Sequence, residues 1–172
     1  MRRTDHQAAY EALLKRYLNP LQRLAYGYAR DPAAREDLFQ EIALALWTAL
    51  PSFRGDASER TWLYRVAHNT AIRFTTRRMR RARHEQADEG VAEPVSSADP
   101  ERSAIEGQQR DRLWLAVHAL PVPDRQVVML HLEGLSAADI EAVTGISAGN
   151  VATRLTRLRQ RLAATLGKGH ER

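Results

Sequence analysis

The sequence contains no cysteine, and this absence narrows the chemistry open to the protein. A chain without cysteine cannot form disulfides, zinc–thiolate sites or a catalytic thiolate, and it suits the reducing cytoplasm. Long apolar runs are also absent, since none approaches the roughly 18 residues that cross a bilayer. The N-terminus, MRRTDHQAAYEALL, lacks the apolar core of a secretion signal. We therefore expect a cytoplasmic protein that does not insert into membranes.

Signatures of catalysis are missing as well. The sequence has no glycine-rich phosphate loop, and its six histidines are scattered without a ligand spacing such as His-x-x-x-His. These absences argue against an enzyme, so we expect no catalytic residue, no metal site and no cofactor. A binding protein is the favoured class.

The residue pattern favours helices throughout. No period-two alternation is long enough for a strand, and glycine and proline are sparse inside long stretches of Ala, Leu, Arg and Glu. Apolar residues recur at three- and four-residue steps in TDHQAAYEALLKRYLN, which predicts a first amphipathic helix that ends at Pro20. A second helix is expected from about Leu21 to Tyr28. The predicted fold is all-α.

Two further helices complete the N-terminal half. Asp31 is a cap residue and Pro32 suits a first helical turn, so a helix should begin there and end at Pro51. Its apolar face comprises Leu38, Phe39, Ile42, Leu46 and Leu50. Ser58 can cap a fourth helix, from about Glu59 to Arg81. The apolar positions of that helix are Leu63, Val66, Ala67 and Ile72. Four such helices can share one core.

Charge divides the chain into parts. Residues 71–83 hold six arginines and no acid, whereas residues 85–106 hold seven acids and one arginine. The basic stretch suits a polyanionic partner. Residues 84–103 lose the helical periodicity and collect Asp, Glu, Ser, Pro and Gly, which is the composition of a flexible linker. We expect two small helical domains, residues 4–83 and 104–167, on either side of this acidic linker.

The stretch GLSAADIEAVTGISAGNVATRLTRLRQRL has the form of a helix-turn-helix. Ser136 caps the first helix, and Asp139 can answer it as a capping box. Gly145 makes the turn, and Ser147 caps the second helix. The apolar contacts that fix the crossing are expected from Ile140, Val143, Val151, Leu155, Leu158 and Leu162. Helical patterns also cover residues 104–119 and 123–133.

The second helix of this pair carries four arginines and no acid. Arginine can bridge a guanine edge or neutralise phosphate, and the N-terminal part of such a helix is suited to the major groove of DNA. The exposed face should present Asn150, Thr153, Arg154, Arg157, Arg159 and Arg161. An ordinary helical hairpin with a solvated basic face is the alternative.

Two segments resemble one protein family. LPVPDRQVVMLHLEGLSAADIEAVTGISAGNVATRLTRLRQRL resembles region four of bacterial sigma-70-family factors. EDLFQEIALALWTALPSFRGDASERTWLYRVAHNTAIRFTTRR resembles region two of the extracytoplasmic-function (ECF) branch of that family. The matches occur in family order, without an intervening region three, and span residues 7–166. The resemblance implies a sigma factor that binds RNA polymerase core and directs initiation at promoters through their −10 and −35 elements.

The resemblance assigns four residues to polymerase. Asp37, Gln40, Glu41 and Trp47 lie off the predicted apolar face and would dock on the clamp helices of the beta-prime subunit. A solvated acidic face is the alternative for the acids, and Trp47 fits either core packing or a partner contact. The family also implies a contact with the beta flap and control by a dedicated inhibitor, an anti-sigma factor.

The resemblance places the −10 element on the loop from Phe53 to Arg60 and on the helix after it. Asn69 offers an amide donor and acceptor to the Watson–Crick edge of an unstacked base. Trp62 either wedges at the duplex fork or packs in the core, and Tyr64 and His68 are equally open. Charge alone carries no sequence information, so the arginines suit backbone contacts. These are Arg73, Arg77, Arg78, Arg80 and Arg81.

The resemblance assigns binding of the −35 element to the second helix of the helix-turn-helix. The residues implied are Ser147, Gly149, Asn150, Thr153, Arg154 and Arg157. The chain departs from the family here, with Ala152 where Lys or Arg is frequent and Thr156 where His or an aromatic is common. Asn150 replaces a frequent Thr. These departures lie on the reading surface, so the −35 sequence cannot be transferred from relatives.

A stand-alone helix-turn-helix regulator, which binds duplex DNA without polymerase, is the second hypothesis. The block EDLFQEI…FRGDASERTWLYRVA separates the two hypotheses, because a simple repressor has no need of it. A binding test with and without polymerase core would distinguish them.

Overall fold

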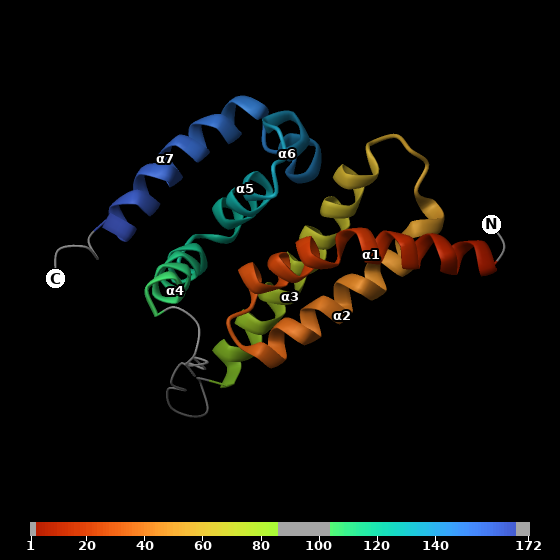
Figure 1. Cartoon of the computed structure of the whole chain (residues 1–172), viewed down its shortest axis with the longest axis horizontal. Helices are drawn as coiled ribbons and strands as arrows, with labels where there is room; N and C mark the ends of the chain where they lie inside the picture. Colours follow the sequence, from red (N-terminus) through yellow and green to blue (C-terminus); the bar gives the residue numbers. More distant parts are fainter. Residues whose placement is uncertain (1–2, 86–103, 168–172) are drawn as a thin grey trace.

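The computed structural model describes residues 3–85 and 104–167, and the regular elements in these ranges are all helical (Figure 1). They are α1 (Arg3–Tyr28), α2 (Pro32–Ala49), the short 3-10 turn η1 (Leu50–Ser52), α3 (Glu59–Glu85), α4 (Ala104–His118), α5 (Val122–Leu132), α6 (Ala137–Thr144) and α7 (Ala148–Gly167). The predicted all-α fold is confirmed. The expected linker lies outside the described residues, except that residues 84 and 85 complete α3. None of the described helices is long and apolar enough to cross a membrane.

Helix α1 is continuous, so the prediction of two helices divided at Pro20 was wrong. A proline inside a helix removes a backbone hydrogen bond and costs about 3 kcal/mol. One buried face nevertheless runs past it: Leu13 is 4% exposed before the proline, and Leu21 and Leu24 are 0% and 1% exposed after it. Each buried leucine contributes about 2 kcal/mol, so burial of this face outweighs the interruption.

Helix α2 begins as predicted. The carboxylate of Asp31 accepts a hydrogen bond from the amide of Ala34 at 3.1 Å, and Pro32 occupies the first turn. Three residues of the predicted apolar face, Leu38, Ile42 and Leu46, are 0% exposed. The helix ends at Ala49, and Pro51 lies in the 3-10 turn that follows.

Helix α3 also begins at its predicted cap, because the hydroxyl of Ser58 accepts a hydrogen bond from the amide of Thr61 at 3.1 Å. It runs to Glu85, beyond the expected end at Arg81. Its buried face comprises Leu63, Tyr64, Ala67, His68, Ala71 and Phe74. The arginine-rich end of α3 is exposed to solvent.

The C-terminal half contains the predicted helix-turn-helix, formed by α6 and α7. The hydroxyl of Ser136 accepts from the amide of Asp139 at 3.1 Å, and the carboxylate of Asp139 accepts from the amide of Ser136 at 3.2 Å. These hydrogen bonds hold the pKa of Asp139 below its usual range. Gly145 has φ of 76°, the left-handed conformation that glycine adopts without strain. Val151 and Leu158 are 0% and 3% exposed and anchor α7.

The two halves pack against each other. Helices α5 and α6 contact α3, and helices α4 and α5 contact α1 (Figure 1). At Gly27, α1 lies so close to α5 that an added Cβ would be 2.6 Å from Cε of Met129. A single apolar cluster includes buried residues of both halves, among them Leu24, Leu63, Val127, Leu130 and Ile140. This cluster joins the two halves, and a second, smaller cluster lies within the C-terminal half, formed by Val117, Leu120, Val128, Met129 and Leu158.

Candidate nucleic-acid interface

The outer face of α7 carries polar and basic side chains. Asn150, Thr153 and Arg157 are exposed, as predicted, whereas Val151 and Leu158 turn inward. The helix forms one edge of the molecule, drawn in blue in Figure 1. Residues 148–167 contain no carboxylate side chain. This face can donate hydrogen bonds to base edges and neutralise phosphates.

The start of α7 is open to close approach. Ser147 and Gly149 are exposed, and a Cβ added at Gly149 would have no heavy atom within 4 Å. The amide of Ala148 donates to the carboxylate of Glu141 in α6 at 2.9 Å. Ser147 contributes its carbonyl, which accepts from the amide of Val151 at 2.9 Å. Helix α6 thus supplies a cap to α7 that sequence reasoning missed.

Arg154 does not lie on the exposed face, and that part of the prediction was wrong. Its side chain is 28% exposed, and its Nη1 donates to Oδ1 of Asp124 in α5 at 2.6 Å. Its Nε donates to Oδ1 of Asn150 at 3.3 Å. Arg154 lies three residues after buried Val151 and four before buried Leu158, so it borders the inward stripe. Periodicity alone does not decide how such a border residue points.

Helices α2 and α3 form a groove of about 630 Å³. Asn69 and Arg73 line it from α3, and both are exposed. Leu44 of α2, which is 65% exposed, lies in the same groove with Val66 and Thr70. The groove thus combines an apolar wall with an amide that can donate and accept hydrogen bonds. An unpaired base needs both features, a surface for its ring and partners for its edge.

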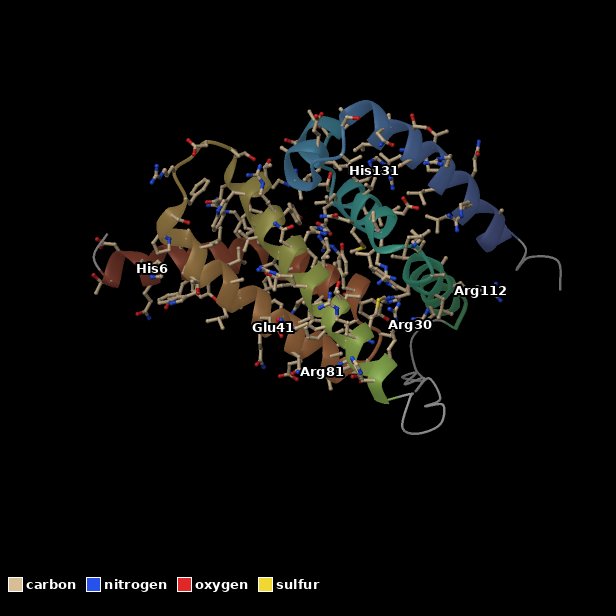
Figure 2. All side chains as sticks on the ribbon, turned by 180° about the vertical axis from the view of Figure 1, so that it is seen from behind. His6, Arg30, Glu41, Arg81, Arg112 and His131 are labelled. Atoms are coloured by element: carbon tan, nitrogen blue, oxygen red, sulfur yellow. The ribbon has the colours of Figure 1, made fainter. Side chains whose placement is uncertain are left out.

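A neighbouring groove of about 810 Å³ collects residues of opposite charge. Asp37, Gln40 and Glu41 line it from α2, facing Arg77 and Arg78 of α3. Nη2 of Arg77 donates to both carboxylate oxygens of Glu41, at 2.6 and 2.7 Å. Figure 2 shows Glu41 on the side of the molecule away from α7. No group of acidic or histidine side chains in the described ranges is arranged to hold a metal ion.

Neither tryptophan expected at a partner surface lines these grooves. The ring of Trp47 lies 4.0 Å from that of His6 and 5.0 Å from that of Tyr10, and its carbonyl accepts from His6 at 3.0 Å. The ring of Trp62 lies 5.0 Å from that of Phe53 and packs against the core. Both side chains are half-buried. Of the two interpretations left open for each, the structure supports packing.

Tyr64 and His68 belong to the core, each being 1% exposed. The hydroxyl of Tyr28 lies within hydrogen-bond distance of Nδ1 of His68, at 2.9 Å. Burial lowers the pKa of His68 to about 3, so the imidazole is neutral near pH 7. Neither side chain reaches the surface, so neither can touch a base in this conformation.

Sequence reasoning also missed Glu133, at the end of α5. Its carboxylate accepts hydrogen bonds from Arg23 of α1 at 2.7 and 2.8 Å and from the hydroxyl of Tyr64 at 3.0 Å. Its backbone carbonyl accepts from Arg60 of α3. These partners lie 69 to 110 positions away in the sequence, so no local pattern could reveal them.

Comparison with known proteins identifies the family. Residues 13–81 match sigma-70 region 2, and residues 110–162 match sigma-70 region 4. An ECF RNA polymerase sigma-E factor of Escherichia coli (strain K12) is 31% identical over 162 residues, which cover 90% of this chain and 84% of the relative. The chain belongs to the sigma-70 family, in its ECF branch. The RNA polymerase sigma-H factor of Pseudomonas aeruginosa is 30% identical over 166 residues, which cover 92% of this chain and 86% of that factor.

Solved structures show the same fold. The sigma factor RpoE of Bartonella quintana, in complex with the anti-sigma factor NepR, has the same fold, with a TM-score of 0.71 at 23% identity over 95% of this chain and 99% of that one. CnrH, in complex with the cytosolic domain of CnrY, gives a TM-score of 0.67 at 26% identity over 94% of this chain and 90% of that one. The predicted function, a sigma factor that directs initiation by RNA polymerase at promoters, is confirmed.

Proposed function

We propose that this sigma factor reads the −35 duplex with α7 and uses the α2–α3 face for both polymerase core and the −10 strand. The observation that carries the proposal is the outer face of α7, which is basic, free of carboxylates and held in a capped helix-turn-helix. A helix mounted in this way can enter the major groove with its N-terminal residues toward the bases.

Within α7, the exposed side chains are the ones proposed to contact base edges. Asn150 and Arg157 can hydrogen-bond to base edges, and Thr153 can contact a base or a phosphate. Ser147 and Gly149 lie where the helix begins, and the small side chain of Ser147 and the absence of one at Gly149 allow the backbone to approach a phosphate. Arg157 is the residue expected to contribute most, because its guanidinium can form two hydrogen bonds to guanine.

In the N-terminal half, Asn69 is the residue proposed to recognise a −10 base. It lies beside the apolar wall of the α2–α3 groove, with Arg73 one turn further along the same helix. The exposed arginines Arg77 and Arg78 would neutralise the backbone of the same strand. Trp62 packs on Phe53 outside the groove, so any part it plays at the duplex fork would need that loop to move.

Asp37, Gln40 and Glu41 form the proposed contact with the clamp helices of polymerase. They share one face of α2, in the groove that also holds the basic residues of α3. Trp47 lies apart from them, packed on α1, and is assigned here to stability. In this conformation Glu41 is paired with Arg77, so a polymerase contact at Glu41 competes with that pair.

The wider organisation follows the same proposal. Residues 4–83 and 104–167 would act as the two functional units, the second of which would also meet the polymerase beta flap. The protein would work by binding rather than by catalysis, without a cofactor, in the cytoplasm where polymerase and chromosome are found. Because the two solved structures described above are complexes with a second protein, one of them named as an anti-sigma factor, we include an inhibitor of that kind among the partners.

The test is transcription in vitro with polymerase core, the full chain and genomic DNA. Initiation at discrete start sites that depend on the chain would support the proposal. The isolated chain should bind duplex weakly, and about six phosphate contacts would give a slope near −5 for log K against log salt. Tight, salt-insensitive binding to a palindrome without polymerase would favour a stand-alone regulator instead. Absence of both core binding and specific start sites would reject the proposal.

A further inference from the structure

Asp124 and Arg154 form a partly buried ion pair under the proposed DNA-reading surface. The carboxylate lies in the first turn of α5 and is 18% exposed, while the guanidinium on α7 is 28% exposed. Nη1 and Oδ1 are 2.6 Å apart, a short charge-assisted hydrogen bond. The neighbouring surface arginine, Arg157, is exposed one turn further along. The two arginines are therefore in different environments although both lie on α7.

Arg154 also touches a residue of the reading surface. Its Nε donates to Oδ1 of Asn150 at 3.3 Å, so Asp124, Arg154 and Asn150 form a chain of hydrogen bonds across α5 and α7. In a carboxamide the oxygen and the NH₂ group are fixed in different directions on one planar carbon, so holding the oxygen also sets where the N–H groups lie. With its oxygen bound by Arg154, the exposed Asn150 side chain has its N–H groups left to donate to a partner.

We infer that Asp124 and Arg154 are positioning residues, which orient the amide of Asn150 so that it presents donors to the DNA. A donor group selects bases that offer acceptors in the major groove, such as guanine O6 and N7 or thymine O4. It does not favour the bidentate contact with adenine, which needs the amide oxygen as well. This inference rests on the proposed function of α7.

Electrostatics favour an Arg154 that stays paired with Asp124 when α7 binds DNA. To reach a base, its guanidinium would have to leave Asp124 and expose an unpaired carboxylate beside a helix that faces a polyanion. A partly buried charge without its partner is unfavourable, and repulsion by phosphate adds to that cost. Arg157 carries no such penalty, because it already faces solvent.

The test uses holoenzyme made from the full chain and polymerase core. A library of duplex promoters randomised in the upstream element is selected for binding and sequenced, which yields a base preference for each position. Asp124→Asn and Arg154→Gln should both relax the preference at the same position, by about tenfold, and the double variant should be no worse than either. Arg157→Gln, the matched control, should relax a different position, and its effect should add to that of Asp124→Asn.

Arg154→Lys separates orientation from folding. Lysine keeps the charge opposite Asp124 but lacks the Nε donor. The melting temperature of this variant should match that of the wild type, while the base preference at the position read by Asn150 is relaxed. If Arg154→Gln alters the preference and Asp124→Asn leaves it unchanged, Arg154 reads bases itself and the inference is overturned. It is equally overturned if neither variant changes the preference. Wild-type holoenzyme that enriches no upstream sequence would reject the proposed function, and the inference with it.

Discussion

Replacing Glu133 with Gln should loosen the contact between the two halves of the sigma factor. The carboxylate is held by Arg23 of α1 and Tyr64 of α3 at 2.7 to 3.0 Å, and Arg60 donates to the carbonyl of the same residue. The Glu133 side chain is only 9% exposed. This one residue at the end of α5 therefore ties the C-terminal half to two helices of the N-terminal half.

The size of the effect follows from these contacts. Hydrogen bonds to a charged group contribute about 1.5–3 kcal/mol each, but Arg23 is 53% exposed, so solvent screens its share. Glutamine keeps one acceptor oxygen and loses the charge. We expect the free energy of unfolding to fall by about 2 kcal/mol, and by less at high salt.

Glu59 provides the matched control. It pairs with Arg16 at 2.7 Å, but the two side chains are 40% and 65% exposed and both lie in the N-terminal half. Glu59→Gln should therefore cost less than about 0.5 kcal/mol. Urea denaturation of the wild type and both variants measures the difference.

The position of the halves can be measured separately, because a chain without cysteine accepts spin labels at chosen sites. Lys15→Cys and Gln160→Cys place labels at exposed positions of α1 and α7. Glu133→Gln should shift the label distances to longer values, whereas Glu59→Gln should leave them unchanged. If the two variants behave alike in both measurements, Glu133 does not hold the halves together.

The contact matters because the packed form is too small to span a promoter. Elements named −10 and −35 are about 25 base pairs apart, roughly 85 Å at 3.4 Å per base pair. A compact chain of 172 residues has a radius of gyration of about 16 Å. If α7 reads one element and the α2–α3 face the other, as proposed, the halves must separate and the Glu133 contacts must break. Glu133→Gln should lower the concentration of chain that half-saturates transcription.

Four further predictions test other parts of the structure. Because burial lowers the pKa of His68 to about 3, the unfolded chain binds a proton at this residue below about pH 6.5 that the folded chain does not. His68 should therefore lower the free energy of unfolding by about 2 kcal/mol between pH 7.5 and 5, and His118, whose pKa burial lowers to about 4, should lower it further. Urea denaturation of His68→Gln should lack the share of His68 and keep that of His118. Gly145→Ala places a Cβ at φ of 76° with no atom within 4 Å, so thermal denaturation should show a conformational loss of about 1 kcal/mol that Gly145→Asn partly restores. Arg157→Ala should weaken promoter occupancy with core binding intact, and Asp37→Ala should weaken core binding with duplex affinity intact, in gel-shift and core-binding assays.

Each of these has a clear contrary outcome. An unchanged pH profile in His68→Gln would mean that another group controls acid stability. Equal melting temperatures for the wild type and Gly145→Ala would show that the turn adjusts without strain. If Arg157→Ala occupies the promoter as well as the wild type does, the basic face of α7 is a solvated surface that does not bind DNA.

The features that the sequence predicted correctly depend on neighbouring residues. Asp31 with Pro32 begins α2, and Ser136 with Asp139 begins α6, because a cap and the amide it receives lie within three residues. Gly145 marks the turn for an equally local reason, its backbone conformation. Such cues survive any tertiary arrangement, so the helix-turn-helix could be placed before the fold was known.

The features that the sequence could not predict depend on distant packing. Pro20 predicted a break, but Leu13 and Leu21 on either side of it are buried against the same core. The pattern of α7 predicted Arg154 at the surface, but the fold brings it beside its partner Asp124, which lies 30 positions earlier in the sequence. In each case a tertiary contact outweighed a local preference that was itself correctly identified.

The ion pair of Glu41 and Arg77 can link the binding of polymerase to the binding of DNA, but only weakly. Glu41 is proposed to meet polymerase and Arg77 to meet DNA, yet in this conformation each neutralises the other. Polymerase bound at Glu41 would release Arg77 for phosphate, so each partner would raise the affinity for the other. With the side chains 39% and 53% exposed, the pair contributes at most about 1 kcal/mol, which limits this coupling to about fivefold. Stronger coupling between polymerase and DNA must come from separation of the two halves, because that separation breaks the Glu133 contacts and the apolar contacts between the halves.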